Sequence, residues 1–151
     1  MNLLINTNSY DVNNLYIMDP VSNNVLDNAV FYRLLYSNSY MTMNSLYFKI
    51  KLSNVSIVKL FNKFKLSFNH ALNKQSLDFI KHIESTLLNK FTFDRKAPQY
   101  CVNEVITSDN LKLYSNKDNL NEYYDILEVY LKISGFWMKD NIYGITYKFS
   151  Y

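Results

Sequence analysis

The fold of this chain is decided by residues 127–149, which read LEVYLKISGFWMKDNIYGITYKF. Apolar residues alternate with polar ones on both sides of the sequence Lys139-Asp140-Asn141. They are Leu127, Val129, Leu131 and Ile133 before it, and Ile145, Tyr147 and Phe149 after it. A period of two indicates half-buried strands, and Asp and Asn favour a turn. The stretch therefore predicts a long antiparallel β-hairpin.

Both glycines of the chain, Gly135 and Gly144, lie inside this hairpin. A turn centred near Asp140 sets them roughly opposite each other. A glycine within a strand marks a bulge, a sharp bend at a barrel corner, or a backbone that another group approaches closely. We favour the closure of a barrel over direct approach by a ligand, and the sequence allows both interpretations.

Outside the hairpin, residues 28–77 form a basic segment without any Asp or Glu. Its basic residues are Arg33, Lys49, Lys51, Lys59, Lys63, Lys65 and Lys74, and nine Phe and Tyr residues are threaded among them. Lysines neutralise phosphates, and aromatic rings stack on unpaired bases, so this pattern favours binding of a single-stranded nucleic acid. An ordinary solvated face of a β protein is the alternative.

Two strands are predicted in this segment, and they give the basic residues a common face. Leu46, Phe48, Ile50 and Leu52 alternate with Tyr47, Lys49 and Lys51. Over residues 61–68, Phe64, Leu66 and Phe68 alternate with Lys63, Lys65 and Ser67. Side by side, the two strands predict a basic stripe with one tyrosine. A further strand is predicted over residues 30–36.

One amphipathic helix interrupts the strands, from the N-cap Asn73 to Phe91. Its apolar face repeats at spacings of three and four, and its polar face carries Asp78, Lys81, His82, Glu84 and Asn89. We expect this helix to cover the sheet, because the mixed charge of its polar face does not suit a membrane surface. Short strands are predicted around residues 100–106 and 111–114.

The length predicts a single domain over residues 1–151, in which residues 1–27 form either an acidic arm or an edge strand. This N-terminal segment contains Asp11, Asp19 and Asp27 and no Lys or Arg. As an arm it would fold back over the basic face. As an edge strand it would use residues 12–18.

Several functional classes find no support in the sequence. The single cysteine, Cys101, has no histidine cluster beside it, so we expect no structural metal and a reducing, cytoplasmic compartment. No apolar run reaches the length of a membrane span, and no basic residue precedes Arg33, so we expect neither a membrane segment nor a targeting peptide. Catalytic and cofactor-binding motifs are missing too, so we expect neither an enzyme nor a cofactor.

The hairpin carries a resemblance to a known family. Its strings Leu131–Trp137 and Tyr143–Phe149 resemble the closing hairpin of small single-stranded-DNA-binding proteins from large DNA viruses and from linear plasmids, including the cytoplasmic linear plasmids of yeast. The composition, poor in Gly, Pro, Ala and Arg and rich in Asn, Lys and Tyr, is typical of AT-rich coding and suits such an element. The resemblance implies a mainly β fold with one amphipathic helix, an OB-like five-stranded barrel with the helix inserted between strands. It also implies sequence-tolerant binding of single-stranded DNA during replication of an AT-rich viral or plasmid element.

The resemblance and the periodicity together predict nine nucleic-acid-binding residues. The resemblance assigns aromatic positions to Trp137 and Tyr143 and basic positions to Lys132 and Lys148. The periodicity adds Tyr47, Lys49, Lys51, Lys63 and Lys65. Trp137 suits core burial as well as base stacking, whereas Tyr143 is expected to be exposed.

Two other functions stay open. The chain also suits a structural or assembly protein of a virus-like element, a β-sandwich with a basic face, or a protein that binds duplex termini. RNA and replication proteins are further candidate partners, and the sequence does not fix the oligomeric state.

Overall fold

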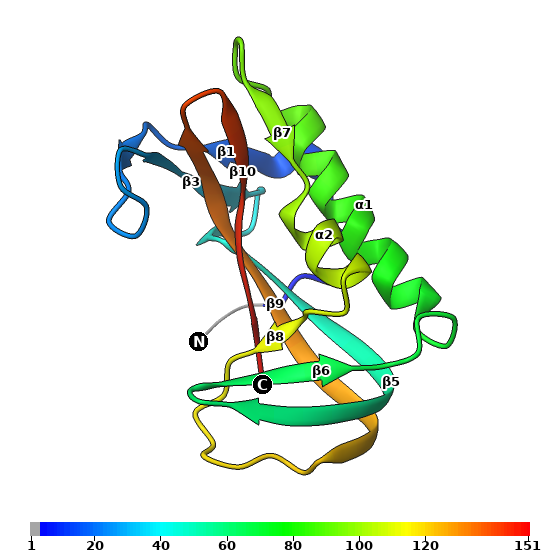
Figure 1. Cartoon of the computed structure of the whole chain (residues 1–151). Coiled ribbons are helices and arrows are strands. Elements are labelled where there is room, and N and C mark those ends of the chain that lie inside the picture. The colour runs from blue at the N-terminus through cyan, green and yellow to red at the C-terminus, as the bar shows by residue number, and fades with distance from the viewer. Residues whose placement is uncertain (1–3) are drawn as a thin grey trace.

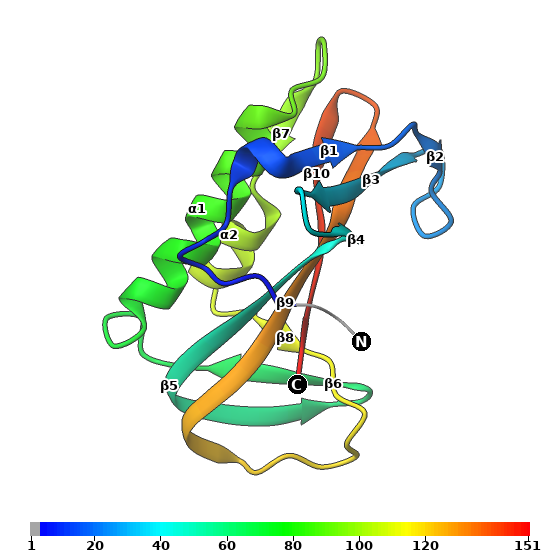
Figure 2. The same ribbon diagram turned by 180° about the vertical axis from the view of Figure 1, so that it is seen from behind.

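The computed structural model describes residues 4–151 as a mainly β protein with two α-helices (Figures 1 and 2). The strands are β1 (Leu15–Ile17), β2 (Val21–Ser22), β3 (Val30–Ser37), β4 (Thr42–Asn44), β5 (Leu46–Leu60), β6 (Lys63–Ser67), β7 (Ala97–Gln99), β8 (Lys112–Leu113), β9 (Tyr123–Lys139) and β10 (Ile142–Ser150). The helices are α1 (Lys74–Lys90) and α2 (Cys101–Thr107), and a 3-10 turn, η1, covers Val12–Asn14.

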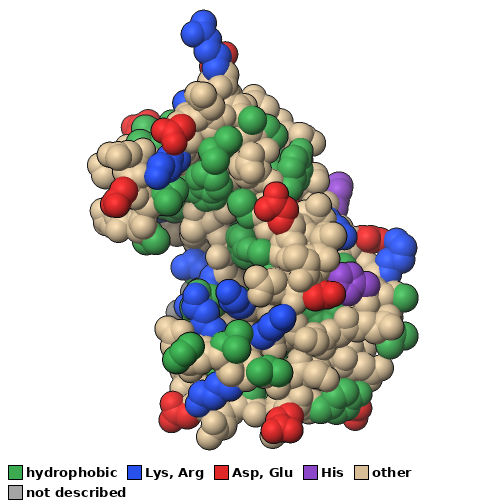
Figure 3. All heavy atoms as spheres, in the orientation of Figure 1, with side chains coloured by type: hydrophobic (Ala, Val, Ile, Leu, Met, Phe, Trp, Pro, Cys, Tyr) green, Lys and Arg blue, Asp and Glu red, His purple; other side chains and the backbone are tan. Residues whose placement is uncertain are grey.

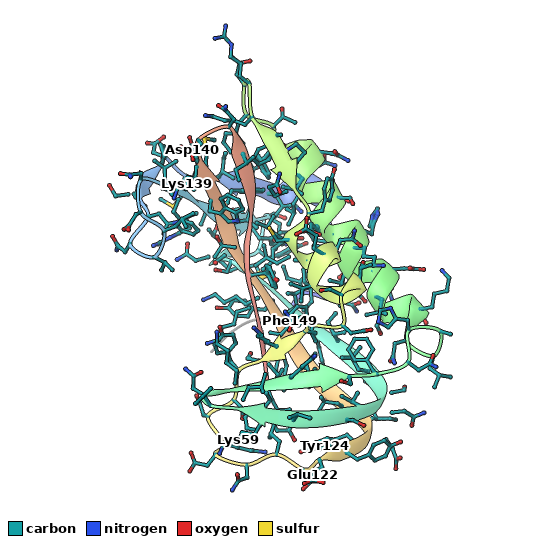
Figure 4. The ribbon with its side chains drawn as sticks, in the orientation of Figure 1. Lys59, Glu122, Tyr124, Lys139, Asp140 and Phe149 are labelled. Atoms are coloured by element: carbon teal, nitrogen blue, oxygen red, sulfur yellow. The ribbon has the colours of Figure 1, made fainter. Side chains whose placement is uncertain are left out.

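Strand β9 is the centre of the sheet. Along one edge it pairs with β10, which confirms the predicted hairpin, and its turn at Asp140 lies at the upper end of the molecule (Figure 4). Along its other edge β9 pairs first with β5 and then, from Gly135 onward, with β3. Because β9 takes part in all three ladders, it positions every strand that carries a predicted site residue except β6.

The two glycines mark the place where β9 changes partners. Gly135 pairs with Thr146 and Gly144 pairs with Trp137, so the glycines are offset along the hairpin rather than directly opposite. The register of the hairpin shifts between Thr146 and Tyr147, which is a β-bulge. A Cβ atom on Gly135 would lie 2.0 Å from the carbonyl oxygen of Tyr32, so only glycine lets β3 approach here.

The strand predicted over residues 46–52 is confirmed as the first half of β5, with Leu46, Phe48, Ile50 and Leu52 buried. The strand continues past a bend at Asn54, whose φ of 52° lies in the left-handed region. The side chain of Asn73 holds this bend. Its Oδ1 accepts from the N–H of Ser53 at 2.7 Å, and its Nδ2 donates to the Ser53 carbonyl oxygen at 3.0 Å.

The second predicted strand is confirmed as β6, which buries Phe64 and Leu66 and begins at Lys63. Phe61, predicted to start this strand, instead occupies the turn between β5 and β6 with a φ of 47°. Its ring is fully exposed.

The predicted helix is confirmed as α1. One residue that was predicted to lie on its exposed polar face lies in the interior instead. Glu84 is buried, and its carboxylate accepts hydrogen bonds from the N–H groups of Val102 (2.8 Å) and Asn103 (2.9 Å). Burial raises the pKa of this carboxyl group, although the two backbone hydrogen bonds oppose the shift. Glu84 thus binds the first turn of α2 and joins the two helices.

The strand predicted over residues 100–106 is wrong, because these residues form α2. The free N–H groups at the start of a helix need acceptors, and Glu84 supplies two from α1. Helix α2 and β7 lie between α1 and β10 (Figure 1). The fold therefore contains two helices rather than the single one predicted.

The sheet is open, so the predicted OB-like barrel is not confirmed. Its strand order is β1-β3-β9-β5-β6-β8, with β10 on the other edge of β9. After β8, Tyr114 forms a single bridge to Ser150 of β10 instead of a continuous ladder. Its N–H donates to the carbonyl oxygen of Phe149, and its own carbonyl oxygen accepts from the N–H of Tyr151, both at 2.9 Å.

The N-terminal segment joins the sheet in three places, one of which is the pairing of β2 with β3. Strand β1 lies at the sheet edge and pairs antiparallel with β3. Ile5 is buried, and its N–H donates to the carbonyl oxygen of Tyr47 at 2.8 Å. Residues 1–3 of the predicted arm lie outside the described residues. None of the helices within residues 4–151 is long and apolar enough to cross a membrane.

Candidate nucleic-acid interface

Three predicted site residues meet in one row across three strands. Tyr47 of β5 pairs with Lys132 of β9, which in turn pairs with Lys148 of β10. All three side chains point to the outer face, because their neighbours along each strand are buried or lie on the opposite face. The Nζ atom of Lys132 lies 5.5 Å from the centroid of the Tyr47 ring, within the range of a cation–π interaction.

Tyr114 extends this row beyond β10 and was missed by the sequence prediction. The bridge to Ser150 holds its backbone beside β10. Two lysines from different strands lie over its ring, Lys148 at 4.5 Å and Lys63 at 4.9 Å from the centroid. The bridge therefore brings Lys63 of β6 to the same place as Lys148, although the two strands are not neighbours in the sheet.

These residues surround a hollow of about 390 Å³, which we call the basic groove. It is lined by Tyr47, Tyr114, Ser115, Asn116, Lys132, Lys148, Ser150 and Tyr151. The lining contains no carboxylate side chain, and within residues 4–151 the ion pairs leave Lys63, Lys132 and Lys148 without an acidic partner. Figure 3 shows Lys and Arg side chains gathered at the narrow middle of the molecule, beside the lower half of β10.

A fourth cation–π pair includes Tyr151 of the groove lining. Lys117 places its Nζ atom 4.5 Å from the centroid of the Tyr151 ring. Neither residue was predicted, because both lie outside the alternating stretches on which the prediction rests. The groove and its surroundings thus offer cations for phosphates and flat rings for bases.

Lys49 and Lys51 are on the outer face of β5 as predicted, but they do not form a free basic stripe. The register places Lys51 opposite Glu128 of β9. The Glu128 carboxylate lies 2.7 Å from Nζ of Lys49 and 3.6 Å from Nζ of Lys51. The hydrogen bond from Lys49 lowers the pKa of Glu128, and the same bond raises the pKa of Lys49. One carboxylate therefore compensates part of the charge of both lysines.

Lys65 does not join the basic groove. It lies on β6 between Val58 of β5 and Lys112 of β8 and is half-buried. The predicted pair of lysines on β6 is therefore split, with Lys63 beside Tyr114 and Lys65 away from the groove lining.

The prediction that Tyr143 is exposed and stacks on a base is wrong, because its side chain is buried. Only 2% of its surface is exposed, and its hydroxyl donates to the carbonyl oxygen of Leu88 at 2.9 Å. Its ring packs edge-on against Phe93, and burial raises the pKa of the hydroxyl. Tyr143 is on the inner face of β10, because it alternates in step with the buried Ile145 and Phe149, and it anchors α1 to the sheet.

Trp137 is neither fully buried nor free in solvent. It is half-buried on β9, paired with Phe31 of β3 on one side and with Gly144 of β10 on the other. It lines a second hollow, at the upper part of the sheet.

The part of the chain that the structure describes holds no group of three or more His, Cys, Asp or Glu side chains placed to bind a metal ion. Comparisons with protein families, curated proteins and solved structures found no match to this chain.

Proposed function

We propose that this protein binds single-stranded DNA without sequence preference, and that the strand lies in the basic groove. One observation carries the proposal: Lys63, Lys132 and Lys148 come together from three strands, unpaired with carboxylates, against the rings of Tyr47 and Tyr114. Lysine ammonium groups displace counterions from phosphates, and tyrosine rings accept any unpaired base. A duplex offers the same phosphates but hides the faces of its bases.

The proposal extends to the biological setting and to the fold type. We propose that the protein supports replication of an AT-rich viral or plasmid element in the cytoplasm, and the support is the resemblance of the hairpin. We also propose that the sheet is an opened relative of the OB-like barrel. Two features support this relation: the helix α1 follows β6 and precedes β8, and Tyr114 bridges to β10 where a closed barrel would have a ladder.

The test is fluorescence anisotropy of a labelled oligo(dT), with the matching duplex as the second probe, at several salt concentrations. We expect tight binding to the single strand, weak binding to the duplex, and a steep fall of affinity with salt. No binding to either probe at low salt would refute the proposal. Preference for the duplex would favour recognition of duplex termini, and an oligo(rU) probe compares RNA with DNA.

An assembly role would be favoured by a large exposed apolar surface without lysine. The end of β5 and the turn after it expose Val58, Leu60 and Phe61, but Lys59 lies among them and Lys63 begins β6 two residues after Phe61. This surface does not meet the criterion, and the proposal of nucleic-acid binding rests on the basic groove.

A further inference from the structure

A second hollow, of about 560 Å³, lies on the outer face of the upper sheet. Phe31 and Arg33 of β3, Trp137 of β9, Thr146 of β10 and the loop residues Asn23 and Val25 are among the residues that line it. A volume of this size falls within the range of small-molecule sites in proteins. The hollow combines three aromatic residues, Phe31, Trp137 and Tyr147, with one cation, and its lining contains no carboxylate side chain.

The only two glycines of the chain lie beneath two of these rings, those of Trp137 and Phe31. A Cβ atom on Gly144 would lie 2.8–2.9 Å from three atoms of the Trp137 indole, and a Cβ atom on Gly135 would lie 2.8 Å from the Phe31 ring. Each ring therefore occupies the space that a side chain would take. The glycines let the rings rest against the sheet, while both rings still line the hollow.

The loop between β2 and β3 supplies another part of the lining and is held by hydrogen bonds of Asn23. The Oδ1 atom of Asn23 accepts from the N–H groups of Val25 (2.9 Å) and Leu26 (3.0 Å), and the Asn23 N–H donates to the carbonyl oxygen of Ala29. The side chain of Val25 is almost completely exposed at the rim. An apolar group at the rim of an aromatic hollow is an additional surface for a flat, apolar ligand.

The hollow and the basic groove both border β10. Thr146 lines the hollow and Lys148 lines the groove, two residues apart on the same strand, which is about 7 Å. Arg33 is exposed and forms no ion pair with the carboxylates of residues 4–151. A guanidinium group that is free of acidic partners is suited to a phosphate.

We propose that the hollow receives one unpaired base of a DNA strand that leaves the basic groove, with the base against Trp137 and Phe31 and its phosphate at Arg33. This inference rests on the proposed function, because it assigns a second contact to the same strand. It gives the strand a path from Lys132 and Lys148 along β10 to Trp137. It also explains why a chain with two glycines has both of them beneath the same hollow.

Trp137 is the only tryptophan, so the intrinsic tryptophan fluorescence of the protein reports on the hollow alone. The experiment titrates the full chain with oligo(dT) while recording tryptophan emission, and measures anisotropy of labelled oligo(dT) in parallel. We expect the emission to be quenched with the same midpoint as the anisotropy change. A bound oligonucleotide should also protect Trp137 from acrylamide quenching.

Variants test the assignment of the two contacts. Trp137→Ala should weaken oligo(dT) binding roughly 5- to 150-fold, the range expected for loss of a stacked base, and Trp137→Phe should restore most of the affinity. Arg33→Ala should weaken binding and reduce the salt dependence, whereas Arg95→Ala, which removes the only other arginine, should change neither. Far-UV circular dichroism checks that each variant is folded.

The outcomes separate this inference from the proposed function. An anisotropy change without quenching or acrylamide protection would overturn the inference and leave binding in the basic groove intact. Wild-type affinity in a folded Arg33→Ala variant would also overturn the assignment of the phosphate. Absence of any anisotropy change would refute the proposed function itself.

Discussion

Two pairs of lysines on the outer face of the same sheet differ in their charged surroundings. Lys49 and Lys51 on β5 share the carboxylate of Glu128, whereas Lys132 and Lys148 on β9 and β10 lie beside tyrosine rings without an acidic partner in the described chain. Both pairs look alike in the sequence, because each lysine alternates with apolar residues. The difference arises from the residue that the neighbouring strand places opposite each lysine.

The net charge on the outer face of a strand thus depends on its pairing register with the neighbouring strand, because the register decides which side chain lies opposite each lysine. A shift of β9 by two residues relative to β5 would keep every side chain on its face but move Glu128 away from Lys51. The basic groove then depends on the β5–β9 ladder as much as on its own lysines.

The largest effect on DNA affinity is expected from removing Lys132 and Lys148, the pair without an acidic partner. Lys132→Ala combined with Lys148→Ala should weaken oligo(dT) binding roughly tenfold at moderate salt and lower the slope of log affinity against log salt by about 1.4, which corresponds to two lost phosphate contacts. Anisotropy titrations over a salt series measure both quantities.

Two double variants serve as controls. Lys49→Ala with Lys51→Ala should change the affinity much less, because Glu128 already compensates part of this charge. Lys81→Ala with Lys90→Ala, on α1, should have no effect. Equal losses in all three double variants would mean that binding follows net charge rather than the basic groove.

Removing the carboxylate of Glu128 should leave Lys49 and Lys51 without an acidic partner, as Lys132 and Lys148 already are. Glu128→Gln keeps the size of the side chain and frees Lys49 and Lys51, so the affinity for oligo(dT) should rise about two- to fivefold, with a steeper salt dependence. The same anisotropy series measures this gain. A loss of affinity would mean that Glu128 itself positions a residue of the groove.

The gain in DNA affinity from Glu128→Gln should depend on pH only at acidic pH, below the ordinary pKa range of a glutamate. The hydrogen bond from Lys49 lowers the pKa of Glu128 below its ordinary 4.5, so the carboxylate stays charged and keeps both lysines paired at about pH 5. The ratio of affinities between Glu128→Gln and wild type should therefore stay constant from about pH 8 to pH 5. It should shrink only at lower pH, where protonation of the wild-type carboxyl frees the same lysines.

The smallest effect on binding is expected at Tyr143. Tyr143→Phe should leave the affinity for oligo(dT) unchanged, in contrast to Tyr114→Ala, because the Tyr143 ring is buried. The lost hydrogen bond to Leu88 should lower the free energy of unfolding by about 1 kcal/mol. Urea unfolding measures this change, and a clear loss of DNA affinity in a folded variant would contradict the core assignment.

The elements that could be predicted from the sequence have one buried face and local turn signals. Strand β6, helix α1, the first half of β5, the middle of β9 and the second half of β10 follow from periodicity, because their apolar residues repeat there without interruption. Helix α2 could not be predicted in this way, since Val102, Val105, Ile106 and Thr107 are β-branched and favour strands. Its first turn depends on Glu84, which comes from a different helix.

The site was predictable only in part for a similar reason. Alternation places Tyr47, Lys132 and Lys148 on the outer face, but it does not give the register that sets them side by side. Tyr114 joins them through a bridge to Ser150, and Glu128 neutralises Lys49 across a strand pair. The burial of Tyr143 depends on the position of α1. All of these are contacts between distant parts of the chain, which a local pattern does not contain.

The central place of β9 has a consequence for how the protein is made. Strands β3 and β5 emerge early from the ribosome, but their ladder partner β9 is synthesised only after residue 122. Most of the sheet therefore cannot assemble during translation of the first two thirds of the chain, and such non-local pairing folds slowly, in milliseconds to seconds. A nascent chain that stops before Tyr123 should remain sensitive to protease, and resistance should appear only once the β9–β10 hairpin has left the exit tunnel.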